Sequence, residues 1–492
     1  MFFLAIDQST SATKALLFDR DGVPVDRESR EHRQHYPHPG WVEHDAEEIW
    51  QNTLTVLRGL LSRHSRKKKG IVSLSIANQR ETIVVFERST GRPLAPAVVW
   101  QCRRGDPFCD AHRQSGAEAL IRRRTGLKLD AYFSGSKLQW LVWDNLELRR
   151  KLADGSALIG TMDAYLIHRL TGGKVFATDY TNASRTLLFD IHTLQWDDTL
   201  CALWDVPRRA LPEVKESSDQ FGKTTLDGML ARPLPIRGVM GDSQASLFAQ
   251  RCFFPGSAKV TFGTGSSVLL NIGSKARTME NGILTALAWV HKGQPTYAFE
   301  GIIISSASTL TWLRDQLGMP DVSELEQLAQ AVPDSGGVHL LPAFNGLGLP
   351  HWRPDVRGAI TGLSSASDRR HVARAAFESI AFQVRDALDS LRRAAGLSSG
   401  TLHADGGPTA SSFLMQLTAD LAATELRVST MRDCSPLGAV LAGQLGLGLH
   451  ESIADLAHTA HAETIYAPRA NADQVAARLS AWSRALRSLL AS

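Results

Sequence analysis

The sequence predicts an α/β protein of two or three domains, and three observations carry that prediction. Apolar runs that stop at polar or glycine-rich turns alternate with amphipathic, helix-like stretches. The chain has 492 residues, which is too long for one compact core. The segments LAIDQSTSATKALLF and KVTFGTGSSVLLNI share a strand–turn–strand plan, with Thr10 and Thr264 in matching turns. Two ordinary hairpins would explain this repeat as well as two similar halves do.

The first elements form a strand pair, a helix and a buried strand. Residues 2–6 and 15–18 are apolar and flank the polar turn DQSTSATK, which predicts antiparallel strands. Residues 45–61 carry a helical apolar stripe and open at Asp45, a candidate N-cap residue. Residues 71–77 are apolar and end abruptly at NQRET, which predicts a buried strand with polar groups at its end.

A carboxylate between a strand and a helix is the main feature of the middle of the chain. Residues 236–240 resemble a strand and residues 243–250 resemble a helix, so Asp242 is expected at a strand end, where functional groups gather. The last long helix is expected at about residues 369–394, where apolar residues recur with helical spacing.

Composition favours a cytoplasmic globular protein. The hydrophobic share of 43%, the charged share of 21% and the net charge of +4 are ordinary, and the basic run RKKKG is most simply a solvated loop. We therefore expect neither a nucleic-acid nor a membrane partner. The five cysteines are scattered and odd in number, which argues against a disulfide framework or a structural zinc. The start MFFLAID resembles a buried strand and not a signal peptide.

The first turn has the residue types of an anion site. Between Asp7 and Lys14 lie Ser9, Thr10 and Ser11. Small residues let backbone N–H groups approach phosphate oxygens, the lysine adds charge, and the carboxylate can hold Mg²⁺ or its waters. The alternative is a plain hairpin with a solvated lysine.

Three further motifs lie at strand ends. Arg80 beside Glu81 can grip vicinal hydroxyls, one side chain donating and the other accepting hydrogen bonds, although a structural ion pair is the alternative. Trp100 can pack on the carbons of a substrate, although a core tryptophan is more common. The stretch ADGGPTASSFLMQ (404–416) can let an adenosine lie against the backbone, although an ordinary helix N-terminus explains it nearly as well.

In this order the motifs resemble the FGGY family of carbohydrate kinases and, within it, most of all the glycerol kinases. Stretches such as GWVEHD, DYTNASRT and GDSQ carry the resemblance, which runs nearly end to end. It implies two actin/hexokinase-like domains, each with a ribonuclease-H-like α/β core, and ATP in a cleft between them. We expect residues 1–246 to form the N-terminal domain and residues 247–492 the C-terminal, nucleotide-binding domain.

The resemblance also implies roles for individual residues. Asp242 would be the general base, taking the proton as a terminal hydroxyl attacks the γ-phosphoryl group of ATP. The positions that match polyol contacts are Arg80, Glu81, Trp100, Tyr132, Asp242, Ser243 and Ser267. The positions that match nucleotide contacts are Thr10, Ser11, Ala12, Lys14, Thr264, Ala307, Thr311, Gly407 and Ser411. Mg²⁺ would be held by Asp7 and Asp242.

Two departures from the family pattern concern the substrate. Ser243 stands where glycerol kinases have a glutamine that contacts glycerol, and Ser267 stands where they have a phenylalanine that packs on it. Both changes remove bulk, so a longer substrate could fit. We expect glycerol, with erythritol, threitol, dihydroxyacetone or xylulose as the alternative. Milder departures lie on the nucleotide side, at Lys14, Ala307, Thr311 and Ser411.

A non-catalytic nucleotide-binding regulator is the competing class of function. It is disfavoured because Asp7, Asp242 and the Thr264 turn are all present, and a binding module needs no general base. The expected partners are a small polyol, ATP and Mg²⁺, and the expected assembly is a homodimer or homotetramer.

Overall fold

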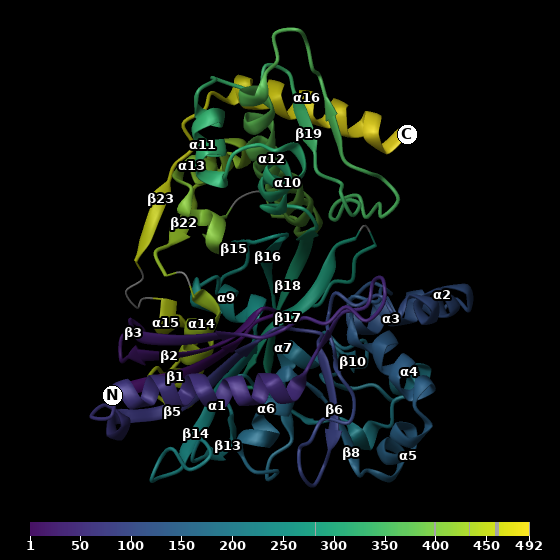
Figure 1. Cartoon of the computed structure of the whole chain (residues 1–492), viewed down its shortest axis with the longest axis vertical. Helices are drawn as coiled ribbons and strands as arrows, with labels where there is room; N and C mark the ends of the chain where they lie inside the picture. The colour runs from purple at the N-terminus through teal and green to yellow at the C-terminus, as the bar shows by residue number, and fades with distance from the viewer. Residues whose placement is uncertain (281, 398–399, 432, 458–461, 492) are drawn as a thin grey trace.

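The computed structural model describes the whole chain except residues 281, 398–399, 432, 458–461 and 492. Figure 1 shows two α/β parts stacked along the long axis of the molecule, each built on its own main sheet. This is the two-domain α/β architecture that the sequence predicts.

The first main sheet has six strands in the order β13-β14-β5-β1-β2-β3. Its strands are β1 (Phe2–Gln8), β2 (Ala12–Asp19), β3 (Pro24–Glu31), β5 (Ile71–Asn78), β13 (Gln220–Thr224) and β14 (Leu234–Gly241). Strand β1 is antiparallel to β2 and parallel to β5, which is parallel to β14. The carboxyl ends of β1, β5 and β14 therefore meet at one edge of the sheet.

The second main sheet has seven strands in the order β17-β18-β16-β15-β21-β22-β23. Its strands are β15 (Ala258–Phe262), β16 (Ser266–Gly273), β17 (Leu284–His291), β18 (Gln294–Ile303), β21 (Leu402–Asp405), β22 (Leu426–Ser429) and β23 (Glu463–Tyr466). The orders β3-β2-β1-β5-β14 and β18-β16-β15-β21-β22 follow one plan, an antiparallel three-strand meander joined to two parallel strands. The internal repeat is thus confirmed as two copies of a ribonuclease-H-like core.

Short strands and three short 3₁₀ helices complete the connections. The short strands are β4 (Glu43–His44), β6 (Ile83–Glu87), β7 (Ala97–Val98), β8 (Ala157–Thr161), β9 (Ala177–Asp179), β10 (Phe189–Asp190), β11 (Gln195–Trp196), β12 (Glu213–Lys215), β19 (His339–Leu341) and β20 (Ala359–Thr361). The 3₁₀ helices are η1 (Lys68–Gly70), η2 (Arg208–Ala210) and η3 (Gly407–Ala410).

The helices of the described chain cover these sheets and build the outer parts of both domains (Figure 1). They are α1 (Ala46–Arg63), α2 (Asp106–Gln114), α3 (Glu118–Thr125), α4 (Ser134–Asp144), α5 (Leu146–Asp154), α6 (Met162–Leu170), α7 (Tyr180–Ala183), α8 (Asp198–Leu203), α9 (Asp242–Ala249), α10 (Ser308–Leu317), α11 (Val322–Gln330), α12 (Arg369–Ala395), α13 (Ser412–Ala422), α14 (Cys434–Gly446), α15 (Ile453–Ala457) and α16 (Ala472–Ala491). The predicted N-cap is confirmed, because the Asp45 side chain accepts hydrogen bonds from two backbone N–H groups of α1.

The prediction that α12 is the last long helix is wrong. Helix α16 follows it with 20 residues. Val475, Trp482 and Leu486 of α16 are buried and recur with the spacing of one helical face, so the sequence carries the periodic signal of this helix as well.

Helix α14 comes late in the chain but packs on the first main sheet. It lies against β14, β5 and β1 beside α9, and Figure 1 shows it among the N-terminal elements. Two glycines permit this approach: a Cβ at Gly238 would lie 1.9 Å from the Ala439 carbonyl oxygen, and one at Gly438 would lie 1.8 Å from the Ala245 carbonyl oxygen. The predicted domain division at 246/247 stays a prediction.

Two observations concern the cysteines and the possibility of a membrane span. All five cysteines are buried and free, in agreement with the absence of a disulfide framework. Within the described ranges, no helix combines the length and apolar character needed to cross a membrane.

A buried carboxylate behind the first sheet makes stability depend on pH. Asp163 is fully buried and accepts a hydrogen bond of 2.7 Å from the Thr178 hydroxyl. Burial, with a smaller contribution from Asp179, raises the pKa of Asp163 to about 7. The folded protein therefore keeps a proton that the unfolded chain has released between about pH 4 and pH 7, so stability falls as the pH rises through this window.

We expect Asp163→Asn to remove this dependence. Relative to wild type, the variant should gain about 1–3 kcal/mol in free energy of unfolding between pH 5 and pH 8, measured by urea titration at both values. Asp110→Asn is the matched control, because the Asp110 side chain is 64% exposed. A difference between Asp163→Asn and wild type that is the same at both pH values would contradict the prediction.

Candidate active site

The edge where β1, β5 and β14 end is held together by the short helix α7. The side-chain amides of Asn78, the last residue of β5, and Asn182, in α7, exchange hydrogen bonds of 2.9 and 3.1 Å. The Thr181 hydroxyl accepts one of 2.8 Å from the N–H of Gly241, the residue before Asp242. Arg80 and Asp242, which follow these two strands, are thereby fixed relative to one another.

A chain of alternating charges surrounds Asp242. Arg80 Nε lies 3.3 Å from Asp242 Oδ1, and Arg80 Nη2 donates to Glu300 Oε1 at 2.8 Å. Arg185 Nη1 donates to Glu300 Oε2 and Arg185 Nε to Glu81 Oε1, both at 2.5 Å. Arg80, Glu81, Arg185 and Glu300 are each 5% exposed or less. Glu81 also has a left-handed backbone, with φ of 62°, a strained conformation that often accompanies functional sites.

Asp242 is the accessible member of this group, since its side chain is 39% exposed. Protein atoms packed on its other sides nevertheless raise its pKa, against the opposing effect of the Arg80 guanidinium. Burial alone also raises the pKa of Glu300, but Arg185 and Arg80 outweigh it and bring that pKa to about 2. The site therefore contains one carboxylate that stays ionised and one that binds protons more readily than an ordinary aspartate.

An aromatic pair joins the predicted polyol positions to the first phosphate turn. The rings of Trp100 and Tyr132 lie 5.3 Å apart between centroids, and burial raises the pKa of Tyr132. Trp100 Nε1 donates a hydrogen bond of 2.9 Å to Thr10 Oγ1. Trp100 is thus partly buried against the core and tied to the turn by its indole N–H, and its contact with a substrate stays a prediction.

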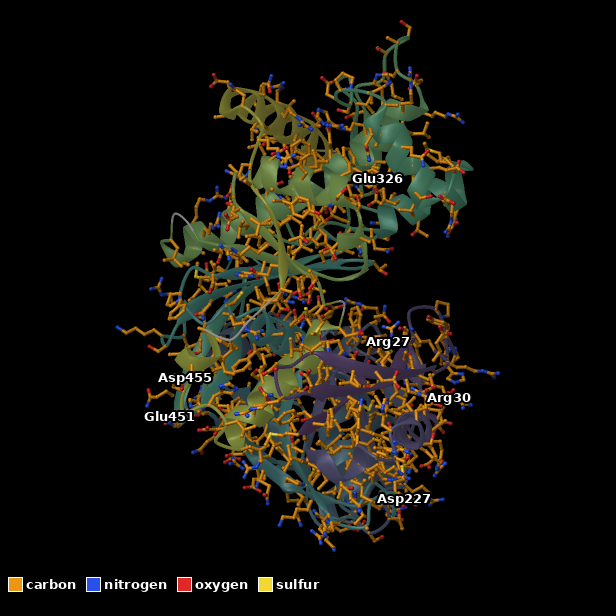
Figure 2. All side chains as sticks on the ribbon, turned by 90° about the vertical axis from the view of Figure 1, so that its left-hand side faces the viewer. Arg27, Arg30, Asp227, Glu326, Glu451 and Asp455 are labelled. Carbon is orange, nitrogen blue, oxygen red and sulfur yellow. The ribbon has the colours of Figure 1, made fainter. Side chains whose placement is uncertain are left out.

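The lysine of the first turn bridges two carboxylates. Lys14 Nζ lies 3.1 Å from Asp7 Oδ2 and 2.9 Å from Asp433 Oδ1, and Arg27, labelled in Figure 2, also pairs with Asp433. Burial lowers the pKa of Lys14, but the two carboxylates outweigh it and raise that pKa above its usual value. The alternative of a solvated lysine is therefore wrong. Ser11, by contrast, is exposed at the tip of the turn, and Ala12 is buried at the start of β2.

The predicted nucleotide positions in the second half also gather in space. The carbonyl of Thr264, an exposed residue between β15 and β16, accepts hydrogen bonds from the N–H groups of Ser306 and Ser308. These residues flank Ala307, the residue that precedes α10, and Thr311 lies one turn further along α10.

The glycine-rich loop after β21 lies beside the same strand end. A Cβ at Gly406 would lie 1.9 Å from the Phe262 carbonyl oxygen, so only glycine allows this approach. Gly407 is exposed next to it. The Ser411 hydroxyl accepts a hydrogen bond of 3.0 Å from Leu414 N–H, which makes it the N-cap of α13. The two nucleotide-side segments thus meet at the end of β15.

The two substituted pocket positions have different surroundings. Ser267 Oγ donates to Glu300 Oε1 at 3.2 Å and stands three residues after Thr264. Ser243 donates its backbone N–H to Asp242 Oδ1 at 2.7 Å. Ser267 therefore lies between the second phosphate turn and the charged group around Asp242.

Sequence reasoning missed four buried or partly buried charged residues of this region: Arg185, Lys259, Glu300 and Asp433. Lys259 is fully buried, so its pKa is lowered, and it acts electrostatically on Asp405 and Asp242. Glu300 could have been found as a lone carboxylate in the apolar run YAFEGII. Asp433 gives no such signal, because only folding brings it to a turn 419 positions away.

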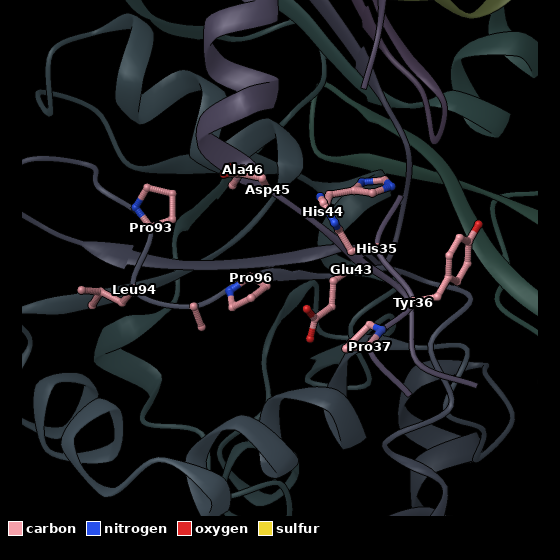
Figure 3. Close-up of a pocket in the computed structure, with 11 residues that line it drawn as sticks. His35, Tyr36, Pro37, Glu43, His44, Asp45, Ala46, Pro93, Leu94 and Pro96 are labelled. Carbon is pink, nitrogen blue, oxygen red and sulfur yellow. The ribbon is translucent and has the colours of Figure 1, made fainter. Parts of the chain in front are cut away.

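A separate pocket of about 700 Å³ lies beside the start of α1 (Figure 3). His35, Tyr36, Glu43, His44 and residues 93–96 contribute to its lining. None of the predicted site residues lines it, so it is distinct from the site around Asp242.

Two family models match the chain in sequence. The N-terminal domain of the FGGY family of carbohydrate kinases matches residues 2–249, and the C-terminal domain of that family matches residues 258–447. The chain belongs to the FGGY family of carbohydrate kinases. Membership of this kinase family implies ATP as a substrate.

Relatives that match this FGGY kinase over nearly their full length are named glycerol kinases. It is 44% identical to glycerol kinase 1 of Thermotoga maritima, over 100% of both chains. It is 42% identical to glycerol kinase of Shewanella oneidensis, over 99% of this chain and 98% of the relative.

Solved structures agree with this kinship. Plasmodium falciparum glycerol kinase with ADP superimposes with a TM-score of 0.93 at 33% identity, over 99% of this chain and 98% of that one. Xylulose kinase of Lactobacillus acidophilus has a TM-score of 0.88 at 20% identity, covering 100% of this chain and 98% of that one. The second similarity supports the fold alone.

The contact between Trp100 and Thr10 yields a prediction for this FGGY kinase. Trp100→Phe keeps the ring next to Tyr132 but removes the N–H donor to Thr10. We expect KM to rise about 3- to 10-fold for both ATP and the acceptor, since one hydrogen bond connects the two binding regions.

Steady-state kinetics with each substrate varied in turn would measure this. Trp143→Phe is the matched control, because Trp143 is 61% exposed and its indole N–H donates to Asp205 instead. An increase confined to one of the two substrates would show that the contact does not connect the regions.

Proposed function

We propose that this chain transfers the γ-phosphoryl group of ATP to a terminal hydroxyl of glycerol, forming glycerol 3-phosphate. The observation that carries the proposal is the accessible Asp242 carboxylate, held 3.3 Å from buried Arg80 at the strand edge that also bears the first phosphate turn. The similarity to proteins named glycerol kinase supports the choice of substrate.

In this proposal Asp242 is the general base. It takes the proton of the attacking hydroxyl as that oxygen bonds to the γ-phosphorus and the bond to the β,γ-bridging oxygen breaks, releasing ADP. Its raised pKa suits this role, because a base works best when its pKa lies closer to the working pH. Arg80 and Glu81 would bind the other hydroxyls, and Trp100 and Tyr132 would cover the carbon chain.

The nucleotide would lie across the two turns. Thr10, Ser11, Ala12 and Lys14 would contact phosphates from the first turn, and Thr264 from the second. The remaining proposed nucleotide contacts are Ala307, Thr311, Gly407 and Ser411. Catalysis would be mostly positioning and charge neutralisation, because phosphoryl transfer needs little covalent chemistry from the protein.

The carboxylates at the site fit Mg²⁺. Asp7 raises the pKa of Asp242 by like-charge repulsion, which a divalent cation between them would relieve. Carboxylate oxygens are ligands that Mg²⁺ prefers, and it commonly keeps several waters. The described residues hold no group of three or more metal-ligating side chains, so phosphate oxygens and water would complete the coordination. When bound, the cation would neutralise phosphate charge.

A second candidate is a kinase for a larger polyol or a ketose. Ser267 and Ser243 are small where glycerol kinases carry a phenylalanine and a glutamine, and Ser267 turns its hydroxyl toward Glu300. The space next to Asp242 would then accept erythritol, threitol, xylulose or dihydroxyacetone. A non-catalytic regulator remains the least supported function, because the proposed base and both turns are present.

We also infer the setting in which the enzyme works. The free, buried cysteines fit the reducing cytoplasm. A homodimer or homotetramer with domains 1–246 and 247–492 is proposed, without nucleic-acid or membrane partners.

The role of Asp242 is testable by Asp242→Asn. We expect kcat to fall by about 10²–10⁴-fold, because the amide cannot accept the proton, while ATP affinity measured by calorimetry changes little. Asp227→Asn is the matched control, because Asp227 (labelled in Figure 2) is exposed and precedes β14, at the opposite end of that strand from Asp242. Normal turnover by Asp242→Asn would mean that the base is another residue.

Substrate choice is testable with a panel of glycerol, dihydroxyacetone, erythritol, both threitols, xylulose and ribulose. We expect the highest kcat/KM for glycerol. Restoring bulk with Ser243→Gln and Ser267→Phe should raise the preference for glycerol over erythritol by about 10- to 100-fold, because a filled pocket excludes the extra carbon. A four-carbon polyol that exceeds glycerol in wild type would favour the second candidate.

A further inference from the structure

We propose that Arg185 and Glu300 are positioning residues that hold Arg80 and Glu81 in place for the acceptor and tie the acceptor site to strand β18 of the C-terminal half. The inference rests on the proposed phosphorylation of a polyol. Neither residue would touch the substrate, so each acts through Arg80 or Glu81.

The geometry points to one connected device. Glu300 receives Arg80 Nη2 on Oε1 and Arg185 Nη1 on Oε2, so each of its oxygens serves a different arginine. Arg185 in turn binds Glu81 Oε1 through Nε and lies over the Phe133 ring, 5.1 Å from its centroid. Arg80 and Glu81, which both follow β5, are therefore linked to each other through two other residues. Glu300 comes from β18, and Arg185 comes from the segment after α7.

Stability alone does not explain such a group. Each of the four charges is removed from water, and a buried ion pair often stabilises a fold no more than a well-packed apolar pair does. Planar guanidinium groups held by two-pronged carboxylates are well suited to fixing orientation. Orientation is also what a pair of hydroxyl-binding side chains needs, because small misplacements reduce the rate strongly.

Glu300 and Asp242 share Arg80. Arg80 Nε faces Asp242 while Nη2 binds Glu300 and Nη1 binds Gln244 Oε1 at 3.2 Å. Without Glu300, Arg80 would keep Asp242 as its nearest carboxylate, because Glu81 lies 3.9 Å from Nε. The guanidinium would then shift toward the base and away from the acceptor.

Other neighbours of Asp242 have partners of their own. From α14, the Ser435 hydroxyl donates to the Asp242 backbone carbonyl, and the Asp7 carboxylate of β1 pairs with Lys14. Glu300 is thus the buried carboxylate that draws Nη2 of Arg80 away from Asp242.

Strand β18 also connects this group to the nucleotide side. Glu300 pairs across the sheet with Leu269 of β16, and Ser267 of β16 donates to Glu300. Because β16 begins directly after the Thr264 turn, one strand pair carries both a proposed phosphate contact and the carboxylate that holds Arg80. A change in the position of β18 would reach both sites.

Glu300→Gln tests the proposal in the full-length enzyme. We expect KM for glycerol to rise about 10-fold or more, as for loss of a hydrogen bond to a charged group, while KM for ATP stays within about two-fold. A merely structural role would lower the fraction of folded enzyme, and with it kcat, without a selective rise in KM for glycerol. Glu147→Gln is the matched control, since its side chain is 77% exposed.

Two conservative variants separate the effect of side-chain charge from the effect of side-chain length and shape. Glu300→Asp keeps the charge but shortens the arm, so KM for glycerol should rise while KM for ATP should not. Arg185→Lys, which cannot bridge Glu81 and Glu300 with a planar fork, should also raise KM for glycerol. These variants decide the question if Glu300→Gln does not fold, as judged by its thermal midpoint.

The outcomes distinguish this inference from the proposed function. If wild type fails to phosphorylate glycerol or any other polyol of the panel, the proposed function is wrong. If wild type is active but Glu300→Gln, or in its place both conservative variants, keep the wild-type KM for the polyol, the positioning role is wrong.

Discussion

The site depends on one guanidinium that two carboxylates share. Arg80 is buried among protein atoms, and its charge is divided between Glu300, which remains ionised, and Asp242, which keeps access to solvent. As a result, the pKa values of these two neighbouring acids are shifted in opposite directions. Glu300 has its pKa lowered to about 2, whereas that of Asp242 is raised. Separation of acid properties by environment is how a protein obtains a base and a fixed counter-charge from the same functional group.

The fold makes this arrangement possible by placing strand ends together. Strands β5 and β14 are parallel neighbours, so Arg80 and Asp242 emerge at one edge, and the hydrogen bonds of α7 fix the two strand ends. The second copy of the five-strand plan supplies Glu300 and the Thr264 turn from the opposite side. The accessible Asp242 carboxylate, the proposed base, thus lies near turns supplied by two similar cores.

Segments late in the chain contribute contacts to the N-terminal sheet and to its first turn. Helix α14 packs on the first sheet through close contacts at Gly238 and Gly438, and its first residues bring Ser435 to Asp242. Just before α14, Asp433 pairs with Lys14 of the first turn. The first phosphate turn is therefore shaped by residues from both ends of the sequence.

The sequence by itself determined the local elements and the family. Apolar runs and their turns predicted β1, β2, β5, β14 and the hairpin of β15 and β16, because strand and turn preferences act over a few residues. The order of motifs identified the kinase family and the residues at strand ends. Only the tertiary structure decided which charges share a partner. Arg185, Glu300 and Asp433 lie 104 to 419 positions from the residues they bind, and no local preference encodes a contact over that distance. The burial that raises the pKa of Asp242 and the arginine pairing that lowers the pKa of Glu300 likewise exist only once the two halves of the chain have packed together.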